Sequence, residues 1–112
     1  MDHATELTLS ILDDKKAVSI DRFDFSDGTF IHPNVVVATA GNVRLIDALC
    51  GYLLEGYERA GIAIHHVEGT PESGWILLDV MSVAVHLFLP ETRQYYGVDS
   101  LWADKRVETH GR

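Results

Sequence analysis

A carboxylate and an imidazole near the middle of the second half of the chain are the first candidates for chemistry. Asp79 and His86 lie in two short apolar segments, 75–80 and 83–88, which are separated by a Met-Ser pair. If that pair forms the turn of a β-hairpin, the two side chains lie diagonally on one face. A carboxylate that orients an imidazole can turn it into a general base. The alternative is a polar contact within a recognition surface.

Other catalytic or metal-binding patterns are absent from the sequence. It contains no P-loop, no dinucleotide-binding glycine pattern, no Gly-x-Ser-x-Gly and no Cys-x-x-Cys. His65 and His66 are adjacent on an expected strand, so their side chains point to opposite faces. Cys50 falls on an apolar helix stripe, where a buried structural thiol is expected. We therefore expect no catalytic residue, no metal site and no cofactor.

The hairpin is predicted by strand-type residues on both sides of Met81 and Ser82. With these two residues as the loop, Trp75 pairs with Phe88 at the open end. One face is then aliphatic and belongs to the core: Ile76, Leu78, Val80, Val83, Val85 and Leu87. The other face mixes apolar and polar groups: Trp75, Leu77, Asp79, Ala84, His86 and Phe88. Such a face suits either a partner molecule or a covering helix of the same chain.

Composition limits the class of protein. With 112 residues and 46% apolar content, we expect one domain over residues 1–103 and a mobile, polar tail over 104–112. Seventeen acidic and nine basic residues give a formal charge of −8, which disfavours direct nucleic-acid binding and favours a basic protein partner. No stretch approaches the roughly 20 apolar residues of a membrane span, so a soluble cytoplasmic protein without membrane contact is expected.

The remaining elements follow from hydrophobic periodicity. The longest helix is predicted between Asn42, a suitable N-cap, and Gly61, a suitable C-terminal stop. Further helices are expected at 5–16 and 91–96, and further strands at 17–25, 35–38 and 62–67. The fold class is therefore α/β or α+β, with about five strands flanked by helices. The sheet should be mixed, because a tight hairpin is antiparallel and a strand-helix-strand unit is most often parallel.

The second half of the chain carries a set of residues with a specific pattern. These are Glu68-Gly69, Gly74-Trp75-Ile76-Leu77-Leu78-Asp79, Val85-His86-Leu87-Phe88, Pro90-Glu91, Arg93, Tyr95 or Tyr96, and Leu101-Trp102. The pattern resembles that of the Iojap or RsfS family, the ribosomal silencing factors. The resemblance is dense from 60 to 102 and looser back to residue 20. Two departures from the family pattern are Pro33-Asn34 and, in the hairpin turn, Met81-Ser82.

What the resemblance implies is a fold related to nucleotidyltransferases without their catalytic site. It also implies a non-enzymatic regulator that binds the large ribosomal subunit through its fourteenth protein. By occupying that surface, family members hinder joining of the small subunit and repress translation. A role in large-subunit biogenesis and the formation of homodimers are further implications.

Carried over by position, the mixed face of the hairpin becomes the docking surface. Its expected contact residues are Trp75 as the anchor, Leu77 and Phe88 as apolar surround, and Asp79, His86 and Glu68 as charged contacts. Two alternatives stay open. One is a nucleotide-binding or nucleotidyltransferase-like enzyme, and the other is a homodimer that uses this face as its own interface.

Overall fold

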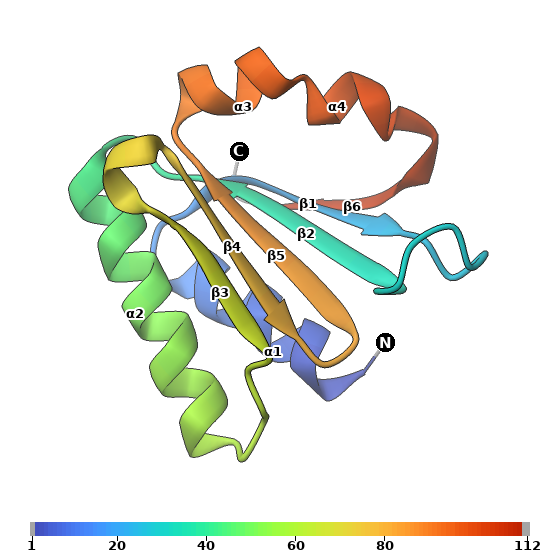
Figure 1. Ribbon diagram of the computed structural model, residues 1–112, viewed down its shortest axis with the longest axis horizontal. Coiled ribbons are helices and arrows are strands. Elements are labelled where there is room, and N and C mark those ends of the chain that lie inside the picture. Colours follow the sequence, from blue (N-terminus) through green and yellow to red (C-terminus); the bar gives the residue numbers. More distant parts are fainter. Residues whose placement is uncertain (1, 111–112) are drawn as a thin grey trace.

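The centre of the structure is a mixed sheet of six strands, one more than the sequence predicts. In the computed structural model, which describes residues 2–110, the strands are β1 (Val18–Asp24), β2 (Asn34–Thr39), β3 (His66–Thr70), β4 (Trp75–Val80), β5 (Val83–Phe88) and β6 (Arg106–His110). The helices are α1 (His3–Asp14), α2 (Val43–Arg59), α3 (Pro90–Tyr96) and α4 (Val98–Leu101). Figure 1 shows α1 and α2 on one side of the sheet and α3 and α4 on the other. The expected α+β class with a mixed, helix-flanked sheet is confirmed.

The order of the strands is β3-β4-β5-β2-β1-β6. β5 pairs with β2 in parallel, whereas the pairs β3–β4 and β4–β5 are antiparallel. β2 and β3 therefore run in the same direction with two strands, β4 and β5, between them, and α2 connects them. The hairpin β4–β5 fills the gap that this wide crossover leaves. Its register is the predicted one, from Trp75 opposite Phe88 to Val80 opposite Val83.

The sixth strand lies where the sequence led us to expect a mobile tail. β6 pairs antiparallel with β1, and the Arg22 side chain donates a hydrogen bond to the Glu108 carboxylate at 2.6 Å. This corrects the expectation for residues 106–110. Backbone pairing and polar cross-strand contacts hold this segment in place. Its sequence therefore lacks the apolar alternation by which a strand is predicted. Residues 111 and 112 of the expected tail lie outside the described residues.

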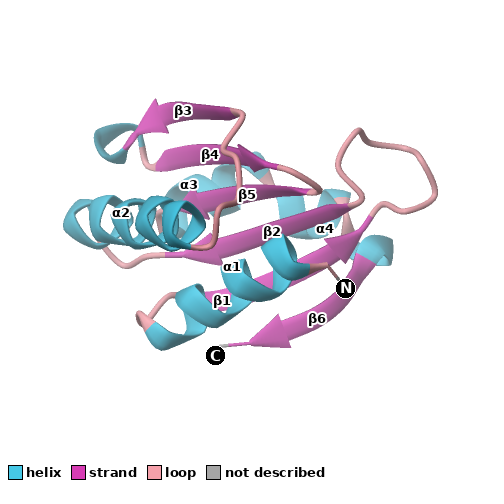
Figure 2. Cartoon of the chain, turned by 90° about the horizontal axis from the view of Figure 1, so that it is seen from below, coloured by secondary structure: helices cyan, strands magenta, loops and turns pink. Residues whose placement is uncertain are grey.

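The inner face of the sheet carries the larger core, under α1 and α2 (Figure 2). The Asn42 side chain accepts a hydrogen bond from the Leu45 N–H at 2.8 Å, which confirms the predicted N-cap of α2. Where the two helices meet, a Cβ on Gly56 would lie 2.4 Å from Ile11 Cδ1, so the missing side chain permits their close approach. The aliphatic face of the hairpin is buried in this core, as predicted: Ile76, Leu78, Val80, Val83, Val85 and Leu87.

A smaller core occupies the outer face, under α3 and α4. Its buried members are Phe23, Phe25, Val35, Val37, Ala84, Phe88 and Val98. Trp102 packs edge-on against Phe23 and Phe25, each at 5.6 Å between ring centroids, and pins the segment after α4 to the sheet as expected. β3 is exposed along its whole length, and the outward residues of β4 are only half-buried. The outer helical layer therefore leaves the β3–β4 side of this face accessible.

The hairpin turn gives a first prediction. Met81 has φ 53°, a left-handed conformation that costs an L-residue about 1–2 kcal/mol and costs glycine almost nothing. We expect the free energy of unfolding of Met81→Gly to be about 1 kcal/mol higher than that of Met81→Ala. Both variants lose the side chain beyond Cβ, but only glycine adopts the left-handed conformation without strain. Urea unfolding of the two variants measures the difference. Equal stability would show that the turn is not strained.

Candidate functional site

The accessible side of the outer face brings together three of the six residues predicted to meet a partner. Cross-strand pairing places Glu68 opposite Leu77 and Thr70 opposite Trp75, so these side chains share one face of the sheet. A cavity of about 240 Å³ opens there. Its lining residues are Glu68, Gly69, Ser73, Trp75, Leu77 and Tyr96. We call this cavity the Trp75 pocket.

The loop before β4 shapes one side of the Trp75 pocket. Gly69 has φ 91°, and a Cβ on it would lie 2.2 Å from the backbone oxygen of Trp75, so only glycine fits. A turn of 3-10 helix, Pro71–Ser73, follows directly. The Thr70 side chain accepts a hydrogen bond from the Ser73 N–H at 3.2 Å and closes a capping box around this turn. The wall of the pocket is therefore held by backbone constraints.

Trp75 is half-buried among aromatic rings. Its indole stacks on Phe88 at 5.1 Å between ring centroids and lies 4.6 Å from the ring of Tyr96 in α3. The indole N–H donates a hydrogen bond to His86 Nδ1 at 3.0 Å. Phe88 itself is 0% exposed, which corrects its predicted role. It lies among other rings and supports Trp75, so its side chain has no surface to offer a partner.

Asp79 and His86 contact different partners, so the acid-base pair that the sequence left open as one alternative does not form. The Asp79 carboxylate lies 3.2 Å from Nε2 of His32, a residue of the loop between β1 and β2. The other ring nitrogen of His32 lies 3.1 Å from the Met81 carbonyl oxygen. Burial lowers the pKa of His86 to about 4. The negative charge of Asp79 acts in the opposite direction and raises this pKa, while His32 lowers it slightly. His86 is thus a neutral acceptor for Trp75 at pH 7.

Two residues of this surface were not among the predicted site residues. Tyr96 carries no assigned role in the sequence beyond its place in the family pattern, yet it is 49% exposed and lines the Trp75 pocket. Its place in the family pattern, as one of two neighbouring tyrosines, was its only sequence signal. His32 had none, because its contact with Asp79 joins residues 47 positions apart.

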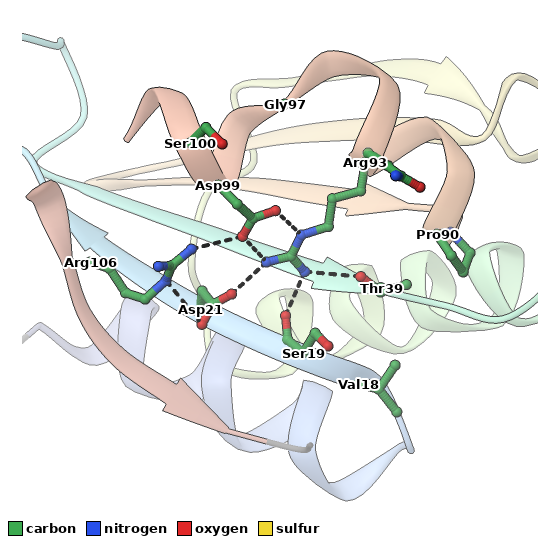
Figure 3. A pocket seen from close by; sticks show the side chains of 11 residues that line it. Val18, Ser19, Asp21, Thr39, Pro90, Arg93, Gly97, Asp99, Ser100 and Arg106 are labelled. Carbon is green, nitrogen blue, oxygen red and sulfur yellow. Dashed lines mark hydrogen bonds and ion pairs between the residues drawn. The ribbon is translucent and has the colours of Figure 1, made fainter. Parts of the chain in front are cut away.

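A second cavity, of about 560 Å³, lies beneath α3 on the opposite side of the outer face, and Arg93 lines it (Figure 3). The side chains of Arg93 and Asp21 are only 8% and 4% exposed. The Arg93 donors reach five acceptors: both carboxylate oxygens of Asp99, one of Asp21, the Ser19 carbonyl oxygen and the Thr39 hydroxyl. A guanidinium has five N–H donors, so all are used within the protein. Arg93 therefore fastens α3 to the sheet and is not free to bind a ligand.

The carboxylates of this cluster have further partners. Asp21 Oδ1 accepts a hydrogen bond from the Thr109 hydroxyl at 2.6 Å, and Arg106 donates to Asp99 at 2.8 Å. The hydrogen bond from Arg93 lowers the pKa of Asp99. Two guanidinium groups thus balance two carboxylates. The cluster joins α3, α4, β1, β2 and β6, and its arrangement is that of a structural ion network.

Neither cavity has the geometry of a metal centre. Within residues 2–110, no three His, Cys, Asp or Glu side chains gather in a way that could hold a metal ion. In the same range, no helix combines the length and apolar character needed to span a membrane. What the outer face offers is an aromatic pocket with a carboxylate at its rim, which is suited to recognition of another molecule.

Comparison with known proteins identifies relatives over almost the whole chain. The family model described as "Ribosomal silencing factor during starvation" matches residues 1–111. A ribosomal silencing factor of Chromobacterium violaceum is 31% identical over 102 residues, which cover 91% of this chain and 84% of that protein. A crystal structure of a protein from the same organism superposes with a TM-score of 0.85 at 30% identity, covering 97% of this chain and 92% of the other. A mouse protein named mitochondrial assembly of ribosomal large subunit protein 1 is 30% identical over 70 residues, 60% of this chain and 31% of its own length.

The Arg93 network predicts a large loss of stability when its centre is removed. Arg93→Met leaves Asp21 and Asp99 without their main partner, and breaking a buried ion pair in this way costs about 3–5 kcal/mol. The matched control is Arg59→Met, because the Arg59 side chain is 78% exposed and pairs with Glu55 at the surface. Chemical unfolding should show a change within about 0.5 kcal/mol for the control. Equal losses in the two variants would contradict the structural role of Arg93.

The environment of His86 predicts a pH dependence. The folded pKa of about 4 lies below the ordinary value, so between pH 6.5 and 4 the unfolded chain binds the proton that the folded chain excludes. Stability should therefore be unaffected by His86 above pH 6.5 and fall by on the order of 3 kcal/mol as the pH drops to 4. His86→Asn keeps an acceptor near the position of Nδ1, where Trp75 donates, and cannot titrate. The free energy of unfolding, measured at several pH values from 7 to 4, should fall more for the wild type than for the variant. An equal fall in both proteins would refute the low pKa of His86.

Proposed function

The chain belongs to the family of ribosomal silencing factors, and from this premise we propose that it binds the large ribosomal subunit and represses translation by blocking the small subunit. The proposed contact is the subunit's fourteenth protein, and the proposed place of action is the cytoplasm. The mechanism is steric and needs no catalysis. The mouse relative, named for assembly of the mitochondrial large subunit, supports a large-subunit partner and a further role in subunit biogenesis.

The observation that carries this proposal is the uncovered β3–β4 side of the outer face. Trp75, Leu77 and Tyr96 expose aromatic and aliphatic surface there, with Glu68 at the rim. Aromatic residues in such positions are the usual anchors of protein interfaces. The chain's formal charge of −8 complements a basic ribosomal protein. We therefore place the docking surface at Glu68, Trp75, Leu77 and Tyr96.

The flanking polar residues have secondary parts in this proposal. Asp79 is half-buried and paired with His32, so it can present one carboxylate edge to a partner. His86 acts through Trp75, because its hydrogen bond fixes the orientation of the indole. The body is large enough for occlusion. With principal extents of 34 × 34 × 24 Å, it would hold a second surface far beyond contact distance if it occupied a subunit interface.

The chemistry of the two cavities gives the nucleotide-enzyme alternative no support. Arg93 lines the larger of the two cavities described and is the cation best placed to meet a phosphate there. All five of its N–H donors, however, are bonded to acceptors within the protein. Asp79 and His86 contact different partners. A homodimer through the β3–β4 side would use the same residues as ribosome docking, so the two would compete.

The test is binding to purified large ribosomal subunits. Trp75→Ala should weaken binding by about 2 kcal/mol or more, roughly 30-fold, because the interface loses its aromatic anchor. Tyr52→Ala is the matched control, since Tyr52 lies on α2, across the sheet from the proposed surface. Co-sedimentation at graded protein concentrations measures both, and urea unfolding verifies that each variant is folded. Wild-type binding by a folded Trp75→Ala protein would refute the docking surface.

A subunit-joining assay tests the mechanism itself. Added wild-type protein should raise the proportion of free large subunits in a sucrose gradient, and Trp75→Ala should not. The protein should migrate with free large subunits and not with joined ribosomes. Migration with joined ribosomes would exclude steric blocking. Light scattering of the wild type and Trp75→Ala distinguishes ribosome docking from the dimer alternative. Only a dimer formed through this face requires the substitution to lower the molecular mass in solution.

A further inference from the structure

We propose that the Trp75 pocket is a binding site for a single arginine side chain of the ribosomal partner. The inference rests on the proposed function for the identity of the partner. The chemistry of the pocket rests on its own walls: two aromatic rings, an aliphatic side chain and a carboxylate around about 240 Å³. These are the groups that bind a flat organic cation.

The aromatic walls come from two separate elements. Trp75 lies at the start of β4 and Tyr96 at the end of α3, and their ring planes meet at 51° with centroids 4.6 Å apart. Two rings set at an angle offer a cation more than one π-face. Phe88 stacks on the Trp75 indole, and the hydrogen bond from the indole N–H to His86 fixes the orientation of the ring. The rings are therefore positioned before any ligand arrives.

The carboxylate lies on the neighbouring edge strand. Glu68 is opposite Leu77 in the β3–β4 ladder, so it borders the aromatic pair on the same face. One oxygen, Oε1, lies 3.1 Å from His66 Nε2. This contact orients the side chain along the strand, while 65% of its surface remains exposed to an incoming group. A guanidinium that stacks on Trp75 could place its N–H fork against this carboxylate.

An aliphatic occupant fits the pocket less well. Burying Leu, Ile or Val against Glu68 would desolvate the carboxylate and add no partner to its existing contact with His66, which is unfavourable. A guanidinium uses both features, because its face stacks on the rings and its edge satisfies the carboxylate. The chain's negative formal charge adds long-range attraction for a basic surface. The structure therefore favours arginine over an apolar anchor.

The first experiment measures large-subunit binding by pocket variants. Glu68→Gln and Tyr96→Leu should each weaken binding about tenfold, and the double variant should lose less than the product of the two because both residues contact one cation. Glu72→Gln is the control, since Glu72 is an exposed acid of the adjacent 3-10 turn and does not line the pocket. It should bind like the wild type. Unchanged or tighter binding by Glu68→Gln would overturn the inference and leave the proposed function standing.

The second experiment needs no ribosome. N-acetyl-arginine methylamide is titrated into the ¹⁵N-labelled protein, and the indole N–H resonance of Trp75 is followed, with Trp102→Phe used to assign it. We expect a saturable shift, a midpoint about tenfold higher in ligand concentration for Glu68→Gln, and a much smaller shift with N-acetyl-norleucine methylamide. An equal or larger response to norleucine would overturn the inference. If the wild type binds arginine amide but not large subunits, the pocket chemistry holds and the proposed function fails.

Discussion

The buried guanidinium of Arg93 is the interaction on which the outer half of the structure depends. It is the only cation of α3 and takes acceptors from β1, β2 and α4. Its removal from water is costly, and only a full set of hydrogen bonds offsets that cost. Ser19 contributes its carbonyl oxygen from a left-handed backbone conformation, with φ 48°, so part of the strain in β1 is compensated by this contact. One side chain thus fastens α3 to the sheet, and Tyr96 is carried on that helix.

The aromatic pocket is a consequence of how the sheet is covered. α1 and α2 together cover the inner face, where the large aliphatic core is buried. α3 and α4 are short, with seven and four residues, and they are tied toward β1 and β6. They cannot also reach β3 and the outer edge of β4. The apolar and aromatic residues at that end, Trp75, Leu77 and Tyr96, are therefore left with a partly exposed surface that a partner could complete.

Local sequence signals predicted the parts of the fold that depend on local chemistry. The hairpin register followed from strict alternation and a two-residue loop, and the start of α2 followed from Asn42. β6 was missed because its side chains make polar contacts that carry no hydrophobic period. The partner of Asp79 could not be predicted either, since His32 reaches it from a distant loop. For the candidate site, sequence reasoning found Trp75, Leu77 and Glu68, while the exclusion of Phe88 and the inclusion of Tyr96 required knowledge of how α3 packs.

The position of β6 also constrains the order of folding. β6 pairs with β1, so Ile20 lies opposite His110, and the edge of the sheet closes only when these distant residues meet. Contacts between residues so far apart in sequence slow folding relative to local contacts. During synthesis, β1 emerges early and has β2 as a neighbour, but its second edge stays open until residue 110 has left the exit tunnel. A nascent chain of this protein therefore carries an unpaired β1 edge until its last strand is available, and an unpaired strand edge is a site at which other chains can add.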